Sequence, residues 1–124
     1  MAVTVLLADD REMIRRSIRR MLEDESRIHV VAEAESFHFA VERARSHRPQ
    51  VVVMDLNMPF RNHVTARDVK SQLASLVPRL FATSFAIDAD SKLLAEACGA
   101  RLLLDKTLLP DQLVPAILGS AASA

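Results

Sequence analysis

The chain has 124 residues, of which 50% are apolar and 26% are charged, which suits one domain with one hydrophobic core. Sixteen basic and sixteen acidic side chains cancel, which argues against a domain that holds nucleic acid by bulk positive charge. One cysteine excludes an internal disulfide, and two glycines are too few for a glycine-rich phosphate loop. No apolar run approaches the roughly 20 residues of a membrane span, and no signal peptide is visible, so we expect a cytoplasmic protein without membrane contact.

The first half of the chain alternates strands and helices regularly. Strands are predicted at Val3–Ala8, Ile28–Ala32 and Val51–Met54, the last buried on both faces because it is apolar without a break. A helix follows the first strand, with Asp10 as a candidate cap. Its apolar face comprises Ile14, Ile18, Met21 and Leu22, and its predicted solvated face comprises Arg15, Arg16, Arg19 and Arg20. A second helix, capped by Ser36, should bury Phe37, Ala40, Val41 and Ala44.

The second half is less regular but repeats the alternation. Strands are predicted at Arg79–Thr83 and Arg101–Leu104. The helix before them is indicated by Ala66, Val69, Leu73 and Leu76. The helix between them should begin at Asp88 or Asp90, end at Gly99, and turn Leu93, Leu94, Ala97 and Cys98 inward. Because Pro115 is costly inside a helix, the final helix (Asp111–Leu118) should start late, near Gln112, or be bent. Five strand–helix units predict an α/β fold with a doubly wound parallel sheet and helices on both faces.

Polar residues follow four of the five predicted strands. They are Asp9 and Asp10, then Asp55, then Thr83 and Ser84, and finally Lys106. Ligands of such sheets bind beyond the carboxyl ends of the strands, so these side chains should converge there. Three carboxylates so close need a cation, and an all-oxygen ligand set suits Mg²⁺, which shares its sites with phosphate. Together with the hydroxyl and the ammonium group they predict a phosphoryl site in which one carboxylate acts as the nucleophile.

With these motifs in place, the sequence resembles a receiver domain of bacterial two-component response regulators. The resemblance spans the whole chain and rests on LLADD (Leu6–Asp10), VVVMDLNMP (Val51–Pro59), FATS (Phe81–Ser84), GA (Gly99–Ala100) and LLLDK (Leu102–Lys106). The residues of these motifs are most similar to those of the receiver subfamily that usually precedes a LuxR/NarL-type helix-turn-helix domain. The resemblance implies a flavodoxin-like five-stranded sheet with the strand order 2-1-3-4-5.

The resemblance also implies a role for each site residue. Asp55 matches the phosphoacceptor, which takes its phosphoryl group from a histidine kinase with Mg²⁺ as cofactor. The metal ligands would be Asp9 (mostly through water), Asp10 (directly), Asp55 and the backbone carbonyl of Asn57. Thr83 matches the switch hydroxyl and Lys106 the phosphate-pairing lysine. Phosphorylation would draw the hydroxyl toward the phosphoryl group and rearrange the last two strand–helix units.

Three departures from the family pattern stand out. Leu103 occupies the position of an aromatic residue that turns inward as the hydroxyl moves, and a leucine cannot make that rotation. The loop 60–63 (FRNH) lacks the usual Asp-Gly turn, so its shape should differ. Thr107 follows Lys106 where the family has a cis proline; a cis bond there would cost roughly 2.5–4 kcal/mol, so we predict a trans bond.

Other polar residues have simpler interpretations. The histidines are scattered without ligand spacing and should be surface or structural residues: His29, His38, His47 and His63. Cys98 should be a small core residue. Phe85 is either an exposed loop aromatic or a barrier that limits the access of water to the phosphoryl group.

The sequence therefore predicts a signalling domain rather than an enzyme: a receiver at residues 1–119, with 120–124 a flexible tail or the start of a linker. Its partner would be a sensor histidine kinase and its output transcription, through a further domain. A homodimer through the last two helices is compatible with the family, and no direct nucleic-acid binding is expected. The alternative is a pseudo-receiver, an interaction module with little phosphorylation-driven switching, which Leu103 and the unusual loop favour. A hydrolase is disfavoured because no separate acid/base residue is visible.

Overall fold

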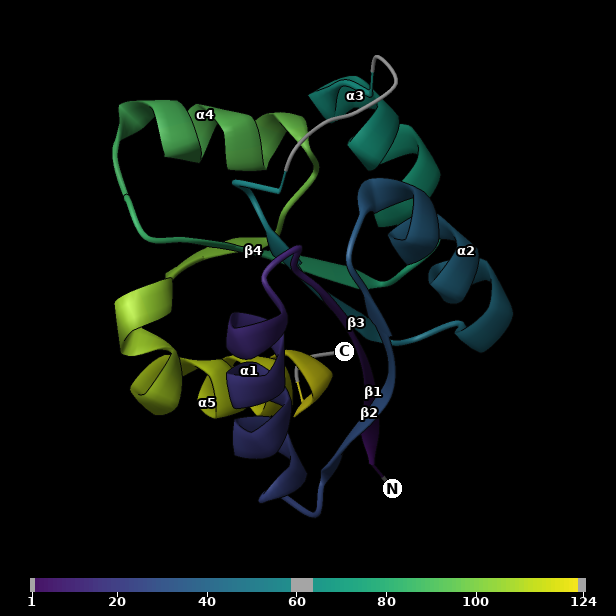
Figure 1. Ribbon diagram of the computed structural model, residues 1–124, viewed down its shortest axis with the longest axis vertical. Helices are drawn as coiled ribbons and strands as arrows, with labels where there is room; N and C mark the ends of the chain where they lie inside the picture. The colour runs from purple at the N-terminus through teal and green to yellow at the C-terminus, as the bar shows by residue number, and fades with distance from the viewer. Residues whose placement is uncertain (1, 59–63, 123–124) are drawn as a thin grey trace.

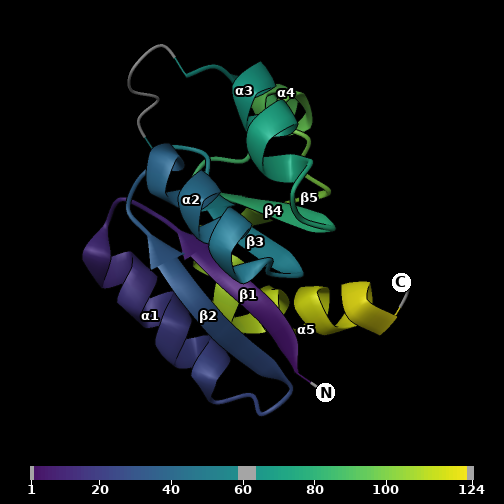
Figure 2. The same cartoon turned by 90° about the vertical axis from the view of Figure 1, so that its right-hand side faces the viewer.

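A computed structural model describes residues 2–58 and 64–122, with side chains to residue 119, and shows a five-stranded parallel sheet between two layers of helices (Figures 1 and 2). The strand order is β2-β1-β3-β4-β5, which confirms the predicted flavodoxin-like fold. The strands are β1 (Val3–Ala8), β2 (Ile28–Ala34), β3 (Val51–Asp55), β4 (Arg79–Ser84) and β5 (Leu102–Asp105). The helices are α1 (Glu12–Glu23), α2 (Phe37–His47), α3 (Ala66–Val69), α4 (Ala89–Ala97) and α5 (Leu109–Ala122).

The hydrophobic core lies on both faces of the sheet because β3 and its neighbours are buried on both sides. α1 and α5 cover one face, where Leu22 and Leu113 belong to one buried cluster with Phe81 of the sheet. α2, α3 and α4 cover the other face, where Ala40, Leu73 and Cys98 pack in one cluster with residues of the sheet. Figure 2 shows these two layers from the side. Among the described residues, no helix combines the length and apolar character needed to cross a bilayer.

The first half follows the predicted pattern closely. β2 extends two residues beyond the predicted end, and β3 includes Asp55 as its last residue. Ser36 caps α2 as predicted, accepting a hydrogen bond from the Phe39 amide at 3.2 Å. The predicted cap at Asp10 is wrong, because α1 begins one residue later, with Arg11 as its N-cap and no side-chain capping bond. The Arg11 amide donates to the carboxylate of Asp9.

The second half departs from the predicted boundaries in several places. α3 is short and continues as a π-helical segment (Lys70–Ala74) rather than as one regular helix. Of the two candidate caps of α4, Asp88 is used, accepting from the Ser91 amide at 2.8 Å. Gly99 ends that unit at φ +81°, as its sequence position predicts. β4 includes Ser84, and β5 runs one residue later than predicted. The predicted loop at residues 60–63 lies outside the described residues.

The buried faces of α4 and α5 differ from the prediction. Leu93 is 65% exposed and Ala97 is also exposed, so the inward face of α4 is made by Leu94, Ala95 and Cys98 instead. α5 begins at Leu109, not near Gln112, after a 3₁₀ turn. It accommodates the proline because the residues that it buries, Leu109, Leu113 and Ile117, offset the loss of one backbone bond, and because Pro115 itself faces outward.

Candidate functional site

The strand ends bring the predicted site residues to one edge of the sheet. Asp55 ends β3 directly opposite Thr83 of β4, and Ser84 pairs with Asp105 in front of Lys106. Asp9 follows β1, and β1 pairs with β3 on the side of β3 that faces away from β4. Parallel strands end together, so residues as far apart as 9 and 106 come into contact at the carboxyl edge.

Three carboxylates form the centre of this edge. Oxygen atoms of Asp9, Asp10 and Asp55 all lie within 4.8 Å of one another. Asp9 and Asp55 are each only 3% exposed, whereas Asp10 faces solvent. Two backbone amides fix the buried pair: that of Arg11 donates to Asp9 Oδ1 and that of Asn57 to Asp55 Oδ1, each at 2.9 Å. The buried acids are therefore oriented before any ligand binds.

Lys106 is the cation that the two buried acids share. Its Nζ donates to Asp9 Oδ2 at 2.9 Å and lies 3.1 Å from Asp55 Oδ1. All three side chains are at most 4% exposed, so these ion pairs are shielded from water. One ammonium group balances only one of the three carboxylates, and the cluster keeps an excess of negative charge.

The surroundings of Asp55 change the pKa of its carboxyl. Burial raises the pKa of the Asp55 carboxyl above its usual value, and the charge of Asp9 raises it further. The Asn57 amide and the Lys106 ammonium oppose this pKa shift by stabilising the ionised form. A carboxylate with a raised pKa beside two others is the arrangement that a divalent cation relieves.

The donor set fits a small, hard divalent ion. The grouped atoms are carboxylate oxygens on rigid strand ends, and the exposed Asp10 leaves one side open to water and a phosphate group. Mg²⁺ prefers such oxygen ligands and retains several waters. The residues of this chain are therefore compatible with Mg²⁺.

The hydroxyl of Thr83 lies at the strand end where the sequence predicts it. Thr83 is 1% exposed, and its Oγ1 is 3.5 Å from the carbonyl oxygen of Met54, to which it donates a long hydrogen bond. Lys106 and Thr107 are joined by a trans bond as predicted, since no cis peptide occurs among the described residues. Leu103 is partly buried and packs against the core beneath α2 to α4.

Two functional contacts were not anticipated from the sequence. The ring of Phe85 lies 5.0 Å from Lys106 Nζ, and only its position two residues after Thr83 hinted at a place near the site. Arg15 is not a solvated residue: its Nη1 donates to the Asp9 carbonyl at 2.8 Å, and its Nε pairs with Glu33 at 2.9 Å. Arg19 also pairs with Glu33, so the predicted solvated face holds only for Arg16 and Arg20.

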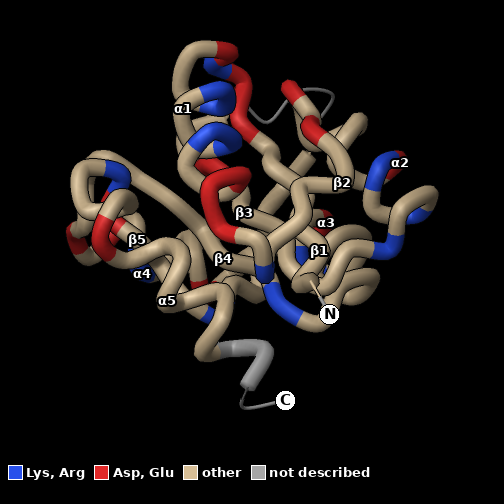
Figure 3. Tube along the Cα trace, turned by 90° about the horizontal axis from the view of Figure 1, so that it is seen from below, with Lys and Arg blue, Asp and Glu red and all other residues tan. Residues whose placement is uncertain are grey.

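The charges of α1 are therefore largely paired. Figure 3 shows basic and acidic stretches side by side along α1. The exposed Arg16 pairs with Glu12 at 3.0 Å. His29, His38 and His47 are exposed, as predicted, and His63 lies outside the described residues. Cys98 is buried as predicted, and burial raises the pKa of its thiol to about 11.

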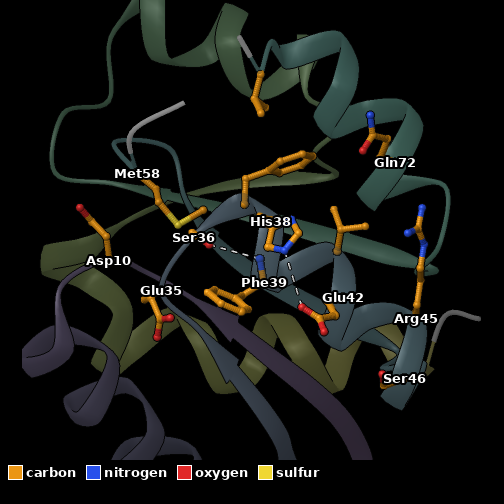
Figure 4. A pocket seen from close by; sticks show the side chains of 13 residues that line it. Asp10, Glu35, Ser36, His38, Phe39, Glu42, Arg45, Ser46, Met58 and Gln72 are labelled. Atoms are coloured by element: carbon orange, nitrogen blue, oxygen red, sulfur yellow. Dashed lines mark hydrogen bonds and ion pairs between the residues drawn. The ribbon is translucent and has the colours of Figure 1, made fainter. Parts of the chain in front are cut away.

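A large hollow of the described structure is distinct from the acidic cluster. It has a volume of about 880 Å³ and lies along α2, between Glu35, Phe39 and Arg45 on one side and Gln72 on the other (Figure 4). Of the three clustered acids only Asp10 reaches its rim. We therefore assign the site from the contacts of the acids and the lysine and not from this hollow.

An acidic cluster and a lysine at the carboxyl edge of a 2-1-3-4-5 sheet define a receiver-type signalling domain. The chain belongs to the response regulator receiver domain family, whose family model matches residues 5–118.

Relatives and solved structures agree with this assignment. The chain is 36% identical over 115 residues to the transcriptional regulatory protein PdtaR of Mycobacterium tuberculosis, covering 91% of this chain and 54% of PdtaR. It is 32% identical over 119 residues to the nitrate/nitrite response regulator protein NarL of Escherichia coli, covering 96% and 55%. The chain thus spans about half the length of these relatives. A LuxR-family two-component response regulator from Aurantimonas superposes with a TM-score of 0.84 at 27% identity, over 99% of this chain and 87% of that one.

Proposed function

We propose that this receiver domain accepts a phosphoryl group on Asp55 from a sensor histidine kinase, with Mg²⁺ as cofactor, and passes a conformational change to an output. The observation that carries the proposal is the contact of Lys106 Nζ with both Asp9 and Asp55 inside the acidic cluster. This contact places a cation beside the carboxylate that would carry the phosphoryl group. One ammonium group offsets only one of the three negative charges, so the cluster keeps negative charge for a metal ion.

The residues that would hold Mg²⁺ are Asp9, Asp10, Asp55 and the backbone carbonyl of Asn57. When bound, the ion would offset the negative charge of the carboxylates and of the phosphoryl oxygens. Among these ligands Asp10 is the exposed one and Asp9 the buried one, already paired with Lys106. This difference supports a direct role for Asp10 and a water-mediated role for Asp9.

Asp55 is prepared for nucleophilic attack through one of its oxygens. Oδ1 accepts the Asn57 amide and faces Lys106, so among the described contacts the other oxygen, Oδ2, is left for the reaction. Attack of Oδ2 on phosphorus would form an O–P bond while the P–N bond to the donor histidine breaks. The imidazole leaves with the electron pair and takes up a proton. Lys106 would then pair with a phosphoryl oxygen, and the hydroxyl of Thr83 would donate to another.

The relatives support a proposal for the wider setting of the domain. PdtaR and NarL are named as regulators of transcription or of a response, and each is about twice as long as the matched region. We infer an output on transcription through a domain outside this sequence, with residues 1–119 as the receiver and 120–124 as tail or linker. A homodimer through the last two helices and the absence of direct nucleic-acid contact belong to the same proposal.

A second candidate is a pseudo-receiver that keeps the fold as an interaction module. Leu103 favours it, because a partly buried leucine in β5 cannot make the aromatic rotation through which the family reports the movement of the hydroxyl. In that case the acids and Lys106 would stabilise the fold without a phosphorylation-dependent change.

One experiment separates the two candidates. Mg²⁺ and beryllofluoride, a phosphoryl mimic, are added to the ¹⁵N-labelled protein, and the amide shifts of Thr83 and Lys106 are followed. A receiver that switches shows shifts at both residues in the wild type and none in Asp55→Ala. Unchanged wild-type spectra, or equal changes in Asp55→Ala, would reject phosphorylation-driven switching.

A further inference from the structure

One aromatic ring contacts the ammonium group of the site, although the proposed reaction gives the ring no part. Lys106 Nζ lies 5.0 Å from the centroid of the Phe85 ring. This is within the roughly 6 Å over which a cation is attracted to the negative face of an aromatic ring. Phe85 itself is 50% exposed, so its position is not explained by burial in the core.

The ring completes the surroundings of the lysine. An ammonium group carries three N–H donors, and here it meets two partners, the carboxylates of Asp9 and Asp55. No further polar partner of Nζ occurs within residues 2–58 and 64–119, yet the Lys106 side chain is only 3% exposed. The half-exposed ring of Phe85 lies beside this buried ammonium group.

The turn that carries Phe85 is tied to the phosphoacceptor. Ser84 Oγ accepts the Ala86 amide at 3.2 Å and donates to the Ala86 carbonyl at 3.0 Å, which holds Phe85 between two bonded residues. Asn57 Nδ2 donates to the same Ser84 Oγ at 3.4 Å, while the Asn57 amide donates to Asp55 Oδ1. These contacts link Asp55 to Asn57, Asn57 to Ser84 and, through its neighbour Phe85, to Lys106. Lys106 in turn contacts Asp55.

We infer that Phe85 is a positioning residue for Lys106: its ring holds the ammonium group over Asp9 and Asp55, where it can pair with an incoming phosphoryl oxygen. The inference rests on the proposed function of Asp55. Phe85 also gives the site an aromatic contact, although Leu103 stands where the family has an aromatic residue in the last strand. A lysine freed from the ring has more rotamers to lose when the phosphoryl group arrives, so binding weakens.

The test compares two substitutions of the ring. Phe85→Leu keeps an apolar side chain but removes the π face, and Phe85→Tyr keeps the ring. The measured quantity is the affinity for beryllofluoride at saturating Mg²⁺. Phe85→Leu is expected to weaken this affinity about threefold to tenfold, the range of one cation–π contact, and Phe85→Tyr to stay within about twofold of wild type. Equal affinities of Phe85→Leu and wild type, or equal losses in both variants, overturn the inference.

Two spectroscopic signals report the contact itself. In the wild type, the ring current should move the ε-methylene protons of Lys106 upfield, and Phe85→Leu should abolish this shift. The chain contains no Trp or Tyr, so Phe85→Trp introduces a single tryptophan at this contact. The hollow of about 260 Å³ beside it, between Met13 and Pro110, leaves room for the larger ring. Its fluorescence should change on adding Mg²⁺ and beryllofluoride, and should not change when Asp55→Asn is also present.

The two proposals fail in different ways. If the wild type does not bind beryllofluoride, the proposed function fails and the inference falls with it. If the wild type binds but Phe85→Leu binds equally well, only the positioning role is rejected. Two measurements check that each variant is folded. A folded variant shows a cooperative thermal unfolding transition and keeps the dispersed amide spectrum.

Discussion

The two halves of this domain, β1 to β3 and α3 to α5, contribute different parts of the site. The first half supplies all three carboxylates on regular elements, with helices of 12 and 11 residues. The second half supplies the hydroxyl, the ammonium group and the ring of Phe85. Two of its three helices are shorter or irregular, with four residues and a π-helical segment in α3 and nine residues in α4, and the third, the 14-residue α5, contains Pro115. The carboxylates thus belong to the more regular half, and the hydroxyl, the ammonium group and the aromatic ring come from the second half.

The halves also differ in how their charges are satisfied. In the first half, Glu33 of β2 binds both Arg15 and Arg19 of α1, which fixes the helix that follows Asp9. In the second half, Lys106 is a buried cation whose partners belong to the first half. A change at Asp55 therefore acts first on a contact between the halves. The predictions below test this division, beginning with the largest expected effect.

Removing the cation that joins the halves should be the most damaging change. Lys106→Met leaves Asp9 and Asp55 buried without a counter-ion, and we expect a loss of about 3 kcal/mol in the free energy of unfolding at pH 7. Urea unfolding measures it, and Lys92→Met, at an exposed lysine of α4, is the control with little expected change. Added Mg²⁺ should restore part of the loss. An unfolding midpoint equal to that of wild type would contradict the division.

Removing one of the acids should act in the opposite direction. Because the pKa of Asp55 is raised in the folded state, the folded protein favours the protonated acid, and ionisation above about pH 4 lowers its stability. Asp55→Asn should therefore be more stable than wild type by about 1 kcal/mol at pH 7 without metal. The gain should vanish near pH 3, where both side chains are neutral. Unfolding curves across this pH range check the sign; a variant less stable than wild type at pH 7 would refute it.

Within the first half, the ion pairs of Glu33 should have a smaller effect. Glu33→Gln removes the partner of both Arg15 and Arg19, and we expect a loss of between about 0.5 and 1 kcal/mol that shrinks with added salt. Glu23→Gln is the matched control: Glu23 is more exposed and pairs only with Arg19, so its change should be close to zero. Thermal unfolding at two salt concentrations distinguishes them. Equal losses would show that burial of Glu33 adds nothing.

The smallest effect is expected on the outer face of α4. Leu93→Ala should change the free energy of unfolding by less than about 0.5 kcal/mol, because Leu93 is 65% exposed. Leu94→Ala, one residue later, should cost clearly more, since Leu94 packs against the core. Chemical unfolding of the two variants compares them directly. A larger loss for Leu93→Ala would mean that α4 is rotated relative to the sheet.

Most of the fold and the central acids of the site could be predicted from the sequence, because the signals are local. An uninterrupted apolar run such as Val51–Met54 specifies a buried strand, and a carboxylate directly after it must lie at the strand's end. The same logic placed Asp9, Thr83 and Lys106 at one edge. Ser36 and Gly99 marked helix ends by their own backbone preferences.

Tertiary packing decided the rest. After α4, Gly99 closely approaches the π-helical segment (Lys70–Ala74), where a Cβ would lie 3.1 Å from the side chain of Ala74. The pairing of Arg15 with Glu33 and of Phe85 with Lys106 joins residues 18 and 21 positions apart, on different elements. Such contacts depend on the distance between finished strands and helices, which no local pattern encodes. The sequence alone therefore determined which groups gather at the edge, and the packed structure determined which of them touch.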